Sequence, residues 1–159
     1  RHATEALRAD RGVVLAAVRQ SGVALQHASE KLRGDQEVVL TAMRGSPDAV
    51  HFASKALLGS REFVLAALKL SPGVLRLVPE KLKKDREVLL AAVKCDPDAF
   101  IHAPRALQCD RKFVLEVVKV SGCAIAHASD ELRADPEVLE AACQNNPQAL
   151  VCARGTVGG

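Results

Sequence analysis

Aromatic residues are scarce in this sequence, which has four Phe, no Trp and no Tyr. The core of a β-sheet usually draws on aromatic and β-branched side chains, so this composition favours closely packed helices built from Ala, Val and Leu. No apolar run reaches the roughly 18 residues that a membrane-spanning helix needs. The net charge of +3, from 22 basic and 19 acidic residues, is also far from the strong basic excess of a typical nucleic-acid-binding domain.

Cysteines are few, and they do not form a framework. The five cysteines are odd in number, have no CxxC spacing and fall at five different positions of the repeat described next: Cys95, Cys109, Cys123, Cys143 and Cys152. Equivalent disulfides in successive repeats are therefore not expected. This usage of cysteine favours a reducing, intracellular setting, and we expect the cytoplasm.

A period of 25 residues runs through the chain without insertion or deletion, so that Asp10 returns as Asp35, Ser60, Asp85, Asp110 and Asp135. A fixed period of this length is typical of repeat arrays, in which each unit buries its apolar face against its neighbours. The pattern predicts an all-α fold, an α-solenoid of about six 25-residue two-helix repeats. The repeats lie near 10–34, 35–59, 60–84, 85–109, 110–134 and 135–154, with a partial unit at 1–9 and a disordered tail at 155–159. We expect the chain to be part of a longer array, or a processed one.

Each repeat opens with a capping signal. The recurring Asp stands just before an amphipathic run, where its carboxylate accepts hydrogen bonds from the free N–H groups of a starting helix. In the first repeat the buried stripe of this helix is predicted to contain Val13, Val14, Ala17 and Val18. A second signal follows, as in Ser46-Pro47 and Asp96-Pro97, where a capping residue precedes Pro at the first position of a short second helix.

The stretch REVLLAAV at 86–93, followed by a break that contains Gly or Pro and then by a segment such as ALQHASEKL at 24–32, resembles the repeat called domain of unknown function 4116. The resemblance covers the chain up to Arg154, and one family unit spans about two of the 25-residue repeats. It implies a helical repeat of uncharacterised role and brings no catalytic or cofactor-binding residues. The family often has an aromatic residue where His27, His102 and His127 stand.

That histidine position is one candidate site. His2, His27, His102 and His127 share it with Phe52, Leu77 and Cys152, so stacked repeats would form a ladder of side chains that includes zinc ligands. Because the same position accepts Phe and Leu, a half-buried packing role is the stronger interpretation. We assign no metal and no cofactor to the chain.

A second candidate is a series of cations at the end of each first helix, Arg19, Arg44, Lys69, Lys94 and Lys119, joined by Arg11, Arg61, Arg86 and Arg111 at the helix starts. Evenly spaced positive charge could follow a phosphate backbone. The alternative is that these are helix-end cations on solvated faces, and the chain lacks exposed aromatics on which bases could stack. Nucleic-acid binding is therefore the second hypothesis.

The positions that vary between repeats give the first hypothesis. Two of them lie three residues apart on one side of the second helix, and a third lies just before it. A uniform scaffold with side chains that differ from repeat to repeat suits recognition of an extended protein or peptide, although neutral drift at exposed positions would give the same pattern. The predicted partner-binding residues are Leu70, Arg76, Cys95, Asp98, Ile101, Val120, Cys123 and Ala126. No catalytic motif is present in the sequence, and we expect a non-catalytic scaffold rather than an enzyme. A purely architectural spacer is a further alternative.

Overall fold

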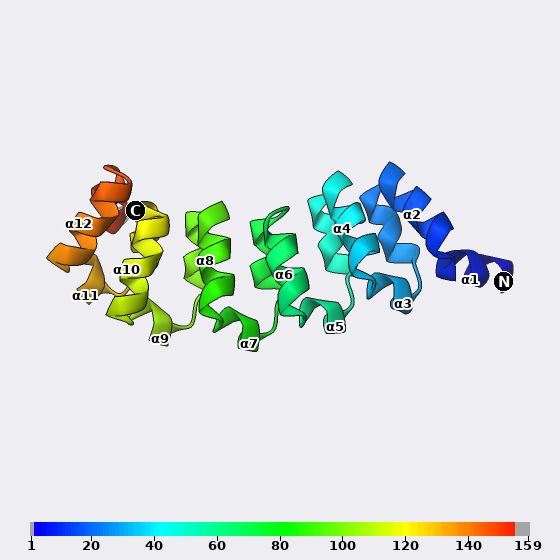
Figure 1. Cartoon of the computed structure of the whole chain (residues 1–159), viewed down its shortest axis with the longest axis horizontal. Helices are drawn as coiled ribbons and strands as arrows, with labels where there is room; N and C mark the ends of the chain where they lie inside the picture. The colour runs from blue at the N-terminus through cyan, green and yellow to red at the C-terminus, as the bar shows by residue number, and fades with distance from the viewer. Residues whose placement is uncertain (1, 155–159) are drawn as a thin grey trace, which may run out of the picture. The chain divides into compact units, whose positions relative to one another are not determined.

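The structure, a computed structural model, describes the backbone of residues 2–154 and the side chains of residues 4–154. The disordered tail predicted at 155–159 lies outside the described residues. Every regular element in the described part of the chain is a helix (Figure 1), so the all-α repeat fold predicted from the sequence is confirmed. Among the described residues no helix is long and apolar enough to cross a membrane.

The chain consists of two compact units, residues 1–79 and 80–159, and the boundary falls within the third repeat. The elements of the first unit are α1 (His2–Ala9), α2 (Arg11–Gln20), η1 (Gly22–His27), α3 (Glu30–Arg33), α4 (Gln36–Gly45), η2 (Pro47–Phe52), α5 (Lys55–Leu58), α6 (Arg61–Leu68) and η3 (Pro72–Arg76), where η denotes a 3₁₀-helix. The elements of the second unit are α7 (Glu80–Lys83), α8 (Arg86–Cys95), η4 (Pro97–His102), α9 (Arg105–Gln108), α10 (Arg111–Val120), η5 (Gly122–His127), α11 (Asp130–Arg133), α12 (Pro136–Asn145) and α13 (Ala149–Ala153). A typical repeat is thus an α-helix, a 3₁₀-helix and one further α-helical turn.

The helix boundaries follow from capping residues. The carboxylate of Asp35 accepts a hydrogen bond from the Val38 N–H at 3.0 Å, and Ser29 caps the following single-turn helix in the same way. The residue between the first and second helices is shared, because Ser46 is the C-cap of α4 and the N-cap of η2. Its backbone is extended, with φ of −149° and ψ of 101°, so the chain turns there and the long helix ends.

The core is made of one stripe from each first helix and the inner residues of each second helix. Val38, Val39, Ala42 and Met43 of α4 are buried, and Ala49 and Val50 of η2 complete the layer. In the first repeat the prediction was wrong for Val13, which is 44 % exposed. Val38 follows a complete repeat, which packs against α4. Val13 is preceded in the described residues only by the single helix α1, which leaves it partly uncovered.

Two glycines allow neighbouring repeats to approach closely. A Cβ atom built on Gly22 would lie 2.4 Å from the carbonyl oxygen of Ala42, and one built on Gly122 would lie 2.3 Å from that of Ala142. Both distances are far shorter than any normal contact. The helices on either side of these glycines, α2 with α4 and α10 with α12, are accordingly in more extensive contact than α4 with α6, where Pro47 occupies the equivalent position.

A recurring backbone hydrogen bond also joins consecutive repeats. The N–H of Ser54 donates to the carbonyl oxygen of Arg33 in the preceding repeat at 2.9 Å, and Ser129 donates to Gln108 at 3.0 Å. Pro79 and Pro104 stand at the equivalent positions of two other repeats and have no N–H to donate. The repeats are therefore attached to one another by different sets of contacts along the chain.

Candidate partner-binding surface

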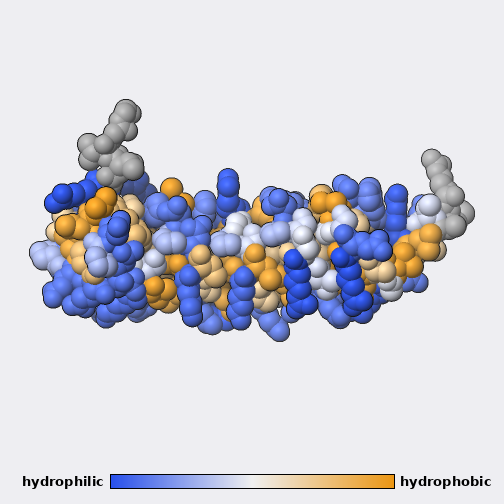
Figure 2. Space-filling view, turned by 90° about the horizontal axis from the view of Figure 1, so that it is seen from above, coloured by the Kyte–Doolittle hydropathy of each residue, from blue (hydrophilic) through white to orange (hydrophobic). Residues whose placement is uncertain are grey.

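The variable residues are displayed by the 3₁₀-helices. With three residues per turn, positions i and i+3 of such a helix lie directly above one another. Asp48 and His51 therefore share one side of η2, and Gly73 and Arg76 share the equivalent side of η3, with all four residues exposed. In the space-filling view of Figure 2, hydrophilic and hydrophobic residues are interspersed over the visible face of the chain.

In the first unit these positions form a groove of about 480 Å³ between η2 and η3, lined by Asp48, Val50, His51, Ser71, Gly73, Arg76 and Leu77. Gly73 contributes no side chain, which leaves the groove open beside Arg76. Within the described part of the chain, Asp48, His51 and Arg76 make no ion pair. The groove thus offers a carboxylate, an imidazole and a guanidinium to a ligand, together with the half-buried apolar side chain of Leu77.

On the equivalent surface of the second unit, side chains of successive repeats contact one another. Nε2 of His127 lies 3.0 Å from an Asp98 carboxylate oxygen, and the Sγ atoms of Cys123 and Cys152 are 2.9 Å apart. Each contact joins the histidine position of one repeat to the first variable position of the preceding repeat, 29 residues earlier. Ile101, on the same 3₁₀-helix as Asp98, is 57 % exposed.

The predicted partner-binding residues divide between the two units. Leu70 and Arg76 belong to the first unit, and the other six belong to the second: Cys95, Asp98, Ile101, Val120, Cys123 and Ala126. Leu70, Cys123 and Ala126 are half-buried, whereas the other five are exposed. Sequence reasoning missed Asp48 and His51 as groove residues, although both stand in the variable positions.

The histidine position does not form a ladder of ligands. Among the described side chains, no three His, Cys, Asp or Glu residues group as a metal site would require. His27 lines an apolar depression with Leu7 and Val13 in the first repeat, and His127 pairs with Asp98. The side chain of His2 lies outside the described residues.

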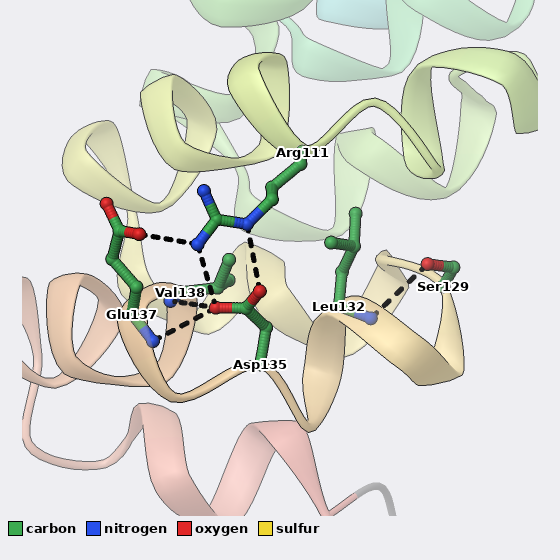
Figure 3. A network of polar contacts seen from close by, with 6 residues as sticks. All are labelled: Arg111, Ser129, Leu132, Asp135, Glu137 and Val138. Atoms are coloured by element: carbon green, nitrogen blue, oxygen red, sulfur yellow. Dashed lines mark hydrogen bonds and ion pairs between the residues drawn. The ribbon is translucent and has the colours of Figure 1, made fainter.

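The cations at the helix starts are ion-paired within the protein. Arg111 contacts the capping carboxylate of Asp135 at 2.9 Å and also pairs with Glu137, both in the next repeat (Figure 3). Hydrogen bonds from Arg111 and from the Val138 N–H hold the pKa of Asp135 below its ordinary value. The pairing with Asp135 and Glu137 in turn raises the pKa of Arg111.

The same type of interaction is found at other junctions between repeats. Arg11 pairs with Asp35 and Glu37, and Arg86 pairs with Asp110 while its guanidinium lies 5.0 Å from the ring centroid of Phe113. These arginines are engaged in holding repeats together. The cations at the helix ends, in contrast, are all exposed and make no ion pair among the described residues: Arg19, Arg44, Lys69, Lys94 and Lys119.

Together the fold and this surface define an all-α tandem-repeat protein. Three consecutive copies of one family model, described as Domain of unknown function (DUF4116), match residues 10–58, 60–108 and 110–154. The chain therefore belongs to this family, and each copy of the family unit spans two 25-residue repeats. A search among curated proteins and a search among solved structures each found no match.

Proposed function

We propose that the chain is a non-catalytic helical-repeat scaffold that binds a protein or peptide partner along its variable face. The variable face is defined here by the exposed positions on the second helices, among them Asp48, His51, Arg76 and Ile101. The recurring Asp and Ser residues cap helices, and the proposal gives none of them a catalytic role. An intracellular, cytoplasmic setting is part of the proposal and is supported by the free cysteines.

The groove between η2 and η3 is the observation that supports this function most directly. Its Asp48 and Arg76 side chains carry opposite charges and have no internal partner among the described residues, while the half-buried Leu77 offers apolar surface. A peptide with one acidic and one basic side chain could pair with both charges while its backbone lies along the groove. Helical-repeat scaffolds commonly present extended binding surfaces of this kind.

Nucleic-acid binding is the second hypothesis and has weaker support. A phosphate backbone needs cations that are free to replace its counterions. Arg11, Arg86 and Arg111 are already paired with carboxylates of the next repeat, which leaves the helix-end cations as the available series. These cations are interspersed with exposed acidic residues such as Asp48 and Asp98.

Selection of peptides from a displayed random library on the immobilised protein would test the proposal. Binding of the selected peptides would then be measured by fluorescence anisotropy for the unmodified protein, for Arg76→Glu and for Lys55→Glu. Lys55 is exposed on α5, outside the variable positions, and its replacement makes the same change of charge. A single-stranded RNA and a DNA duplex of mixed sequence would be titrated alongside.

If the groove binds peptides, Arg76→Glu should weaken binding by about tenfold or more, equivalent to about 1.4 kcal/mol. Lys55→Glu should leave binding within about twofold, and circular dichroism should show unchanged helicity in both variants. Failure to select any peptide, or equal binding by both variants, would reject the groove as the binding site. Tighter binding of nucleic acid than of any peptide, with a steep dependence on salt, would favour the second hypothesis.

A further inference from the structure

Two cysteines from consecutive repeats lie in direct contact in the second unit. Cys123 is on η5 and Cys152 is on α13, two elements that pack against each other. Their Sγ atoms are 2.9 Å apart and share a hydrogen bond. Both residues are half-buried, so a small reagent can still reach the pair.

The stacking of the repeats sets this placement. Asp98 and His127 are also 29 residues apart, occupy the same two repeat positions and are also in contact. The last repeat is held close by Asn145, whose side-chain oxygen accepts a hydrogen bond from the Gly122 N–H at 2.8 Å and whose amide donates to the carbonyl oxygen of Lys119 at 2.9 Å. The Asn146 amide donates to Sγ of Cys123 at 3.3 Å. The two thiols are therefore held together by the surrounding fold.

We propose that Cys123 and Cys152 form a redox-active pair, which hydrogen peroxide or a related peroxide converts into an intramolecular disulfide between the fifth and sixth repeats. The proposal does not depend on partner binding, although Cys123 also belongs to the variable positions. The remaining cysteines are a natural internal comparison, since Cys95 and Cys109 are exposed and neither contacts another thiol among the described residues.

The reaction is balanced by one peroxide molecule. Cys152 loses its proton to solvent, and its thiolate attacks a peroxide oxygen; the O–O bond breaks, hydroxide leaves and a sulfenic acid forms. The Cys123 thiol then attacks the sulfenic sulfur, the S–O bond breaks and water leaves with the Cys123 proton. The two thiols are oxidised by two electrons in total, and the peroxide is reduced to two water molecules.

The order of attack follows from the surroundings of Cys123. The hydrogen bond with Cys152, burial, and the negative charges of Cys152 and Asp98 raise the pKa of Cys123 to about 11. A thiol that keeps its proton is a poor nucleophile toward peroxide. The Cys123 sulfur also accepts a hydrogen bond from the Asn146 amide at 3.3 Å, which occupies a lone pair that attack on peroxide would need. Cys152 is therefore the sulfur that reacts first, and Cys123 is the sulfur that resolves the sulfenic acid.

Mass spectrometry of the whole chain can test the pair. The reduced protein would be treated with hydrogen peroxide under conditions that keep it monomeric, then alkylated and weighed intact. Oxidation should remove the mass of two hydrogens and leave two fewer of the five cysteines open to alkylation. Trypsin should release residues 120–133 joined to residues 134–154, and a Cys143→Ser background makes Cys152 the only partner in the second peptide.

Single variants separate the roles of the two sulfurs. Cys123→Ser should accumulate a sulfenic acid on Cys152 that dimedone labels, whereas Cys152→Ser should leave Cys123 unlabelled at the same peroxide concentration. Cys109→Ser is the matched control and should form the cross-link like the parent protein. Circular dichroism before treatment would establish that each variant is folded.

Three results are expected if Cys123 and Cys152 form the redox-active pair. The cross-link between Cys123 and Cys152 should be the dominant one, should disappear on reduction and should raise the melting temperature of the parent protein but not of Cys152→Ser. Oxidation that falls mainly on Cys95 or Cys109, or that yields only disulfide-linked dimers, would overturn the proposal. Equal dimedone labelling of Cys123 and Cys152 in the two variants would overturn the assigned order of attack.

Discussion

Replacement of Gly122 by Ala tests how closely two repeats of this fold must pack. Gly122 is the first residue of η5, and the added Cβ would lie 2.3 Å from the carbonyl oxygen of Ala142 on α12 and 3.3 Å from Cβ of Ala149. The first contact is with backbone, which cannot rotate away as a flexible side chain can. Either η5 or α12 has to move by about 1 Å to restore a normal separation.

The cost of that movement can be bounded from the packing. Val138, Ala142, Ala124 and Ile125 are fully buried near this interface, and a gap of about 0.5–1 Å forfeits a quarter to a half of the dispersion energy of the atoms that line it. Overpacking of this kind costs about 1–3 kcal/mol, and the hydrogen bond from the Gly122 N–H to Asn145 would weaken as well. Ala also lowers the conformational entropy of the unfolded chain, which stabilises the folded state by about 0.4–1 kcal/mol and offsets part of this cost. We therefore expect the free energy of unfolding to fall by about 2 kcal/mol.

Thermal unfolding followed by circular dichroism would measure the effect. For a chain of this size, about 2 kcal/mol corresponds to a fall in melting temperature of about 4–8 °C. Gly73→Ala is the matched control, since it also lies at the start of a 3₁₀-helix but its Cβ would meet only Ser71 Oγ at 3.6 Å. A melting temperature for Gly122→Ala equal to that of Gly73→Ala would refute the idea that this glycine sets the distance between the repeats.

Two further predictions concern the capping carboxylates. Asp35→Ala removes the acceptor for the Val38 N–H and should lower the unfolding free energy in urea by about 1 kcal/mol, whereas Asp35→Asn keeps a capping oxygen and should cost less; equal losses would contradict the capping role. Because the pKa of Asp135 is lowered in the folded state, its contribution is present above the ordinary pKa of 3.8 and is lost as the pH falls through the folded pKa. The melting temperature of Asp135→Asn should therefore lie below that of the parent protein at neutral pH and converge with it as the pH falls below 3.8. A difference in melting temperature that stays constant with pH would contradict this.

The repeat architecture could be predicted from the sequence because its determinants are local. The cap at Asp35, the break at Ser46-Pro47 and the cap at Ser29 each act on the next few residues, and each lies at the boundary that the structure shows. The 25-residue period then carries these local signals through the chain. The 3₁₀ geometry of the second helix was not predicted, because i+3 and i+4 spacing cannot be told apart over six residues.

The arrangement of the candidate site depends on contacts between repeats, which the period alone does not specify. The offset at which one repeat lies against the next decides which side chains meet. It brings Arg111 to Asp135 and Cys152 to Cys123. The cysteines occupy different repeat positions, so the 25-residue period gives no indication of their contact. Asp48 and His51 were not predicted as site residues. The groove that they line opens where Gly73 lacks a side chain, and that space is visible only when the repeats are packed together.

The serine N–H groups that cross from one repeat to the previous one have a consequence for hydrogen–deuterium exchange. The amide of Ser54 is protected only while its repeat stays attached to Arg33, and the amide of Ser129 only while its repeat stays attached to Gln108. Each amide thus reports the opening of one interface, independently of whether the helices on either side remain folded. Exchange rates at these two serines would show whether single interfaces between repeats open independently or the whole array unfolds together.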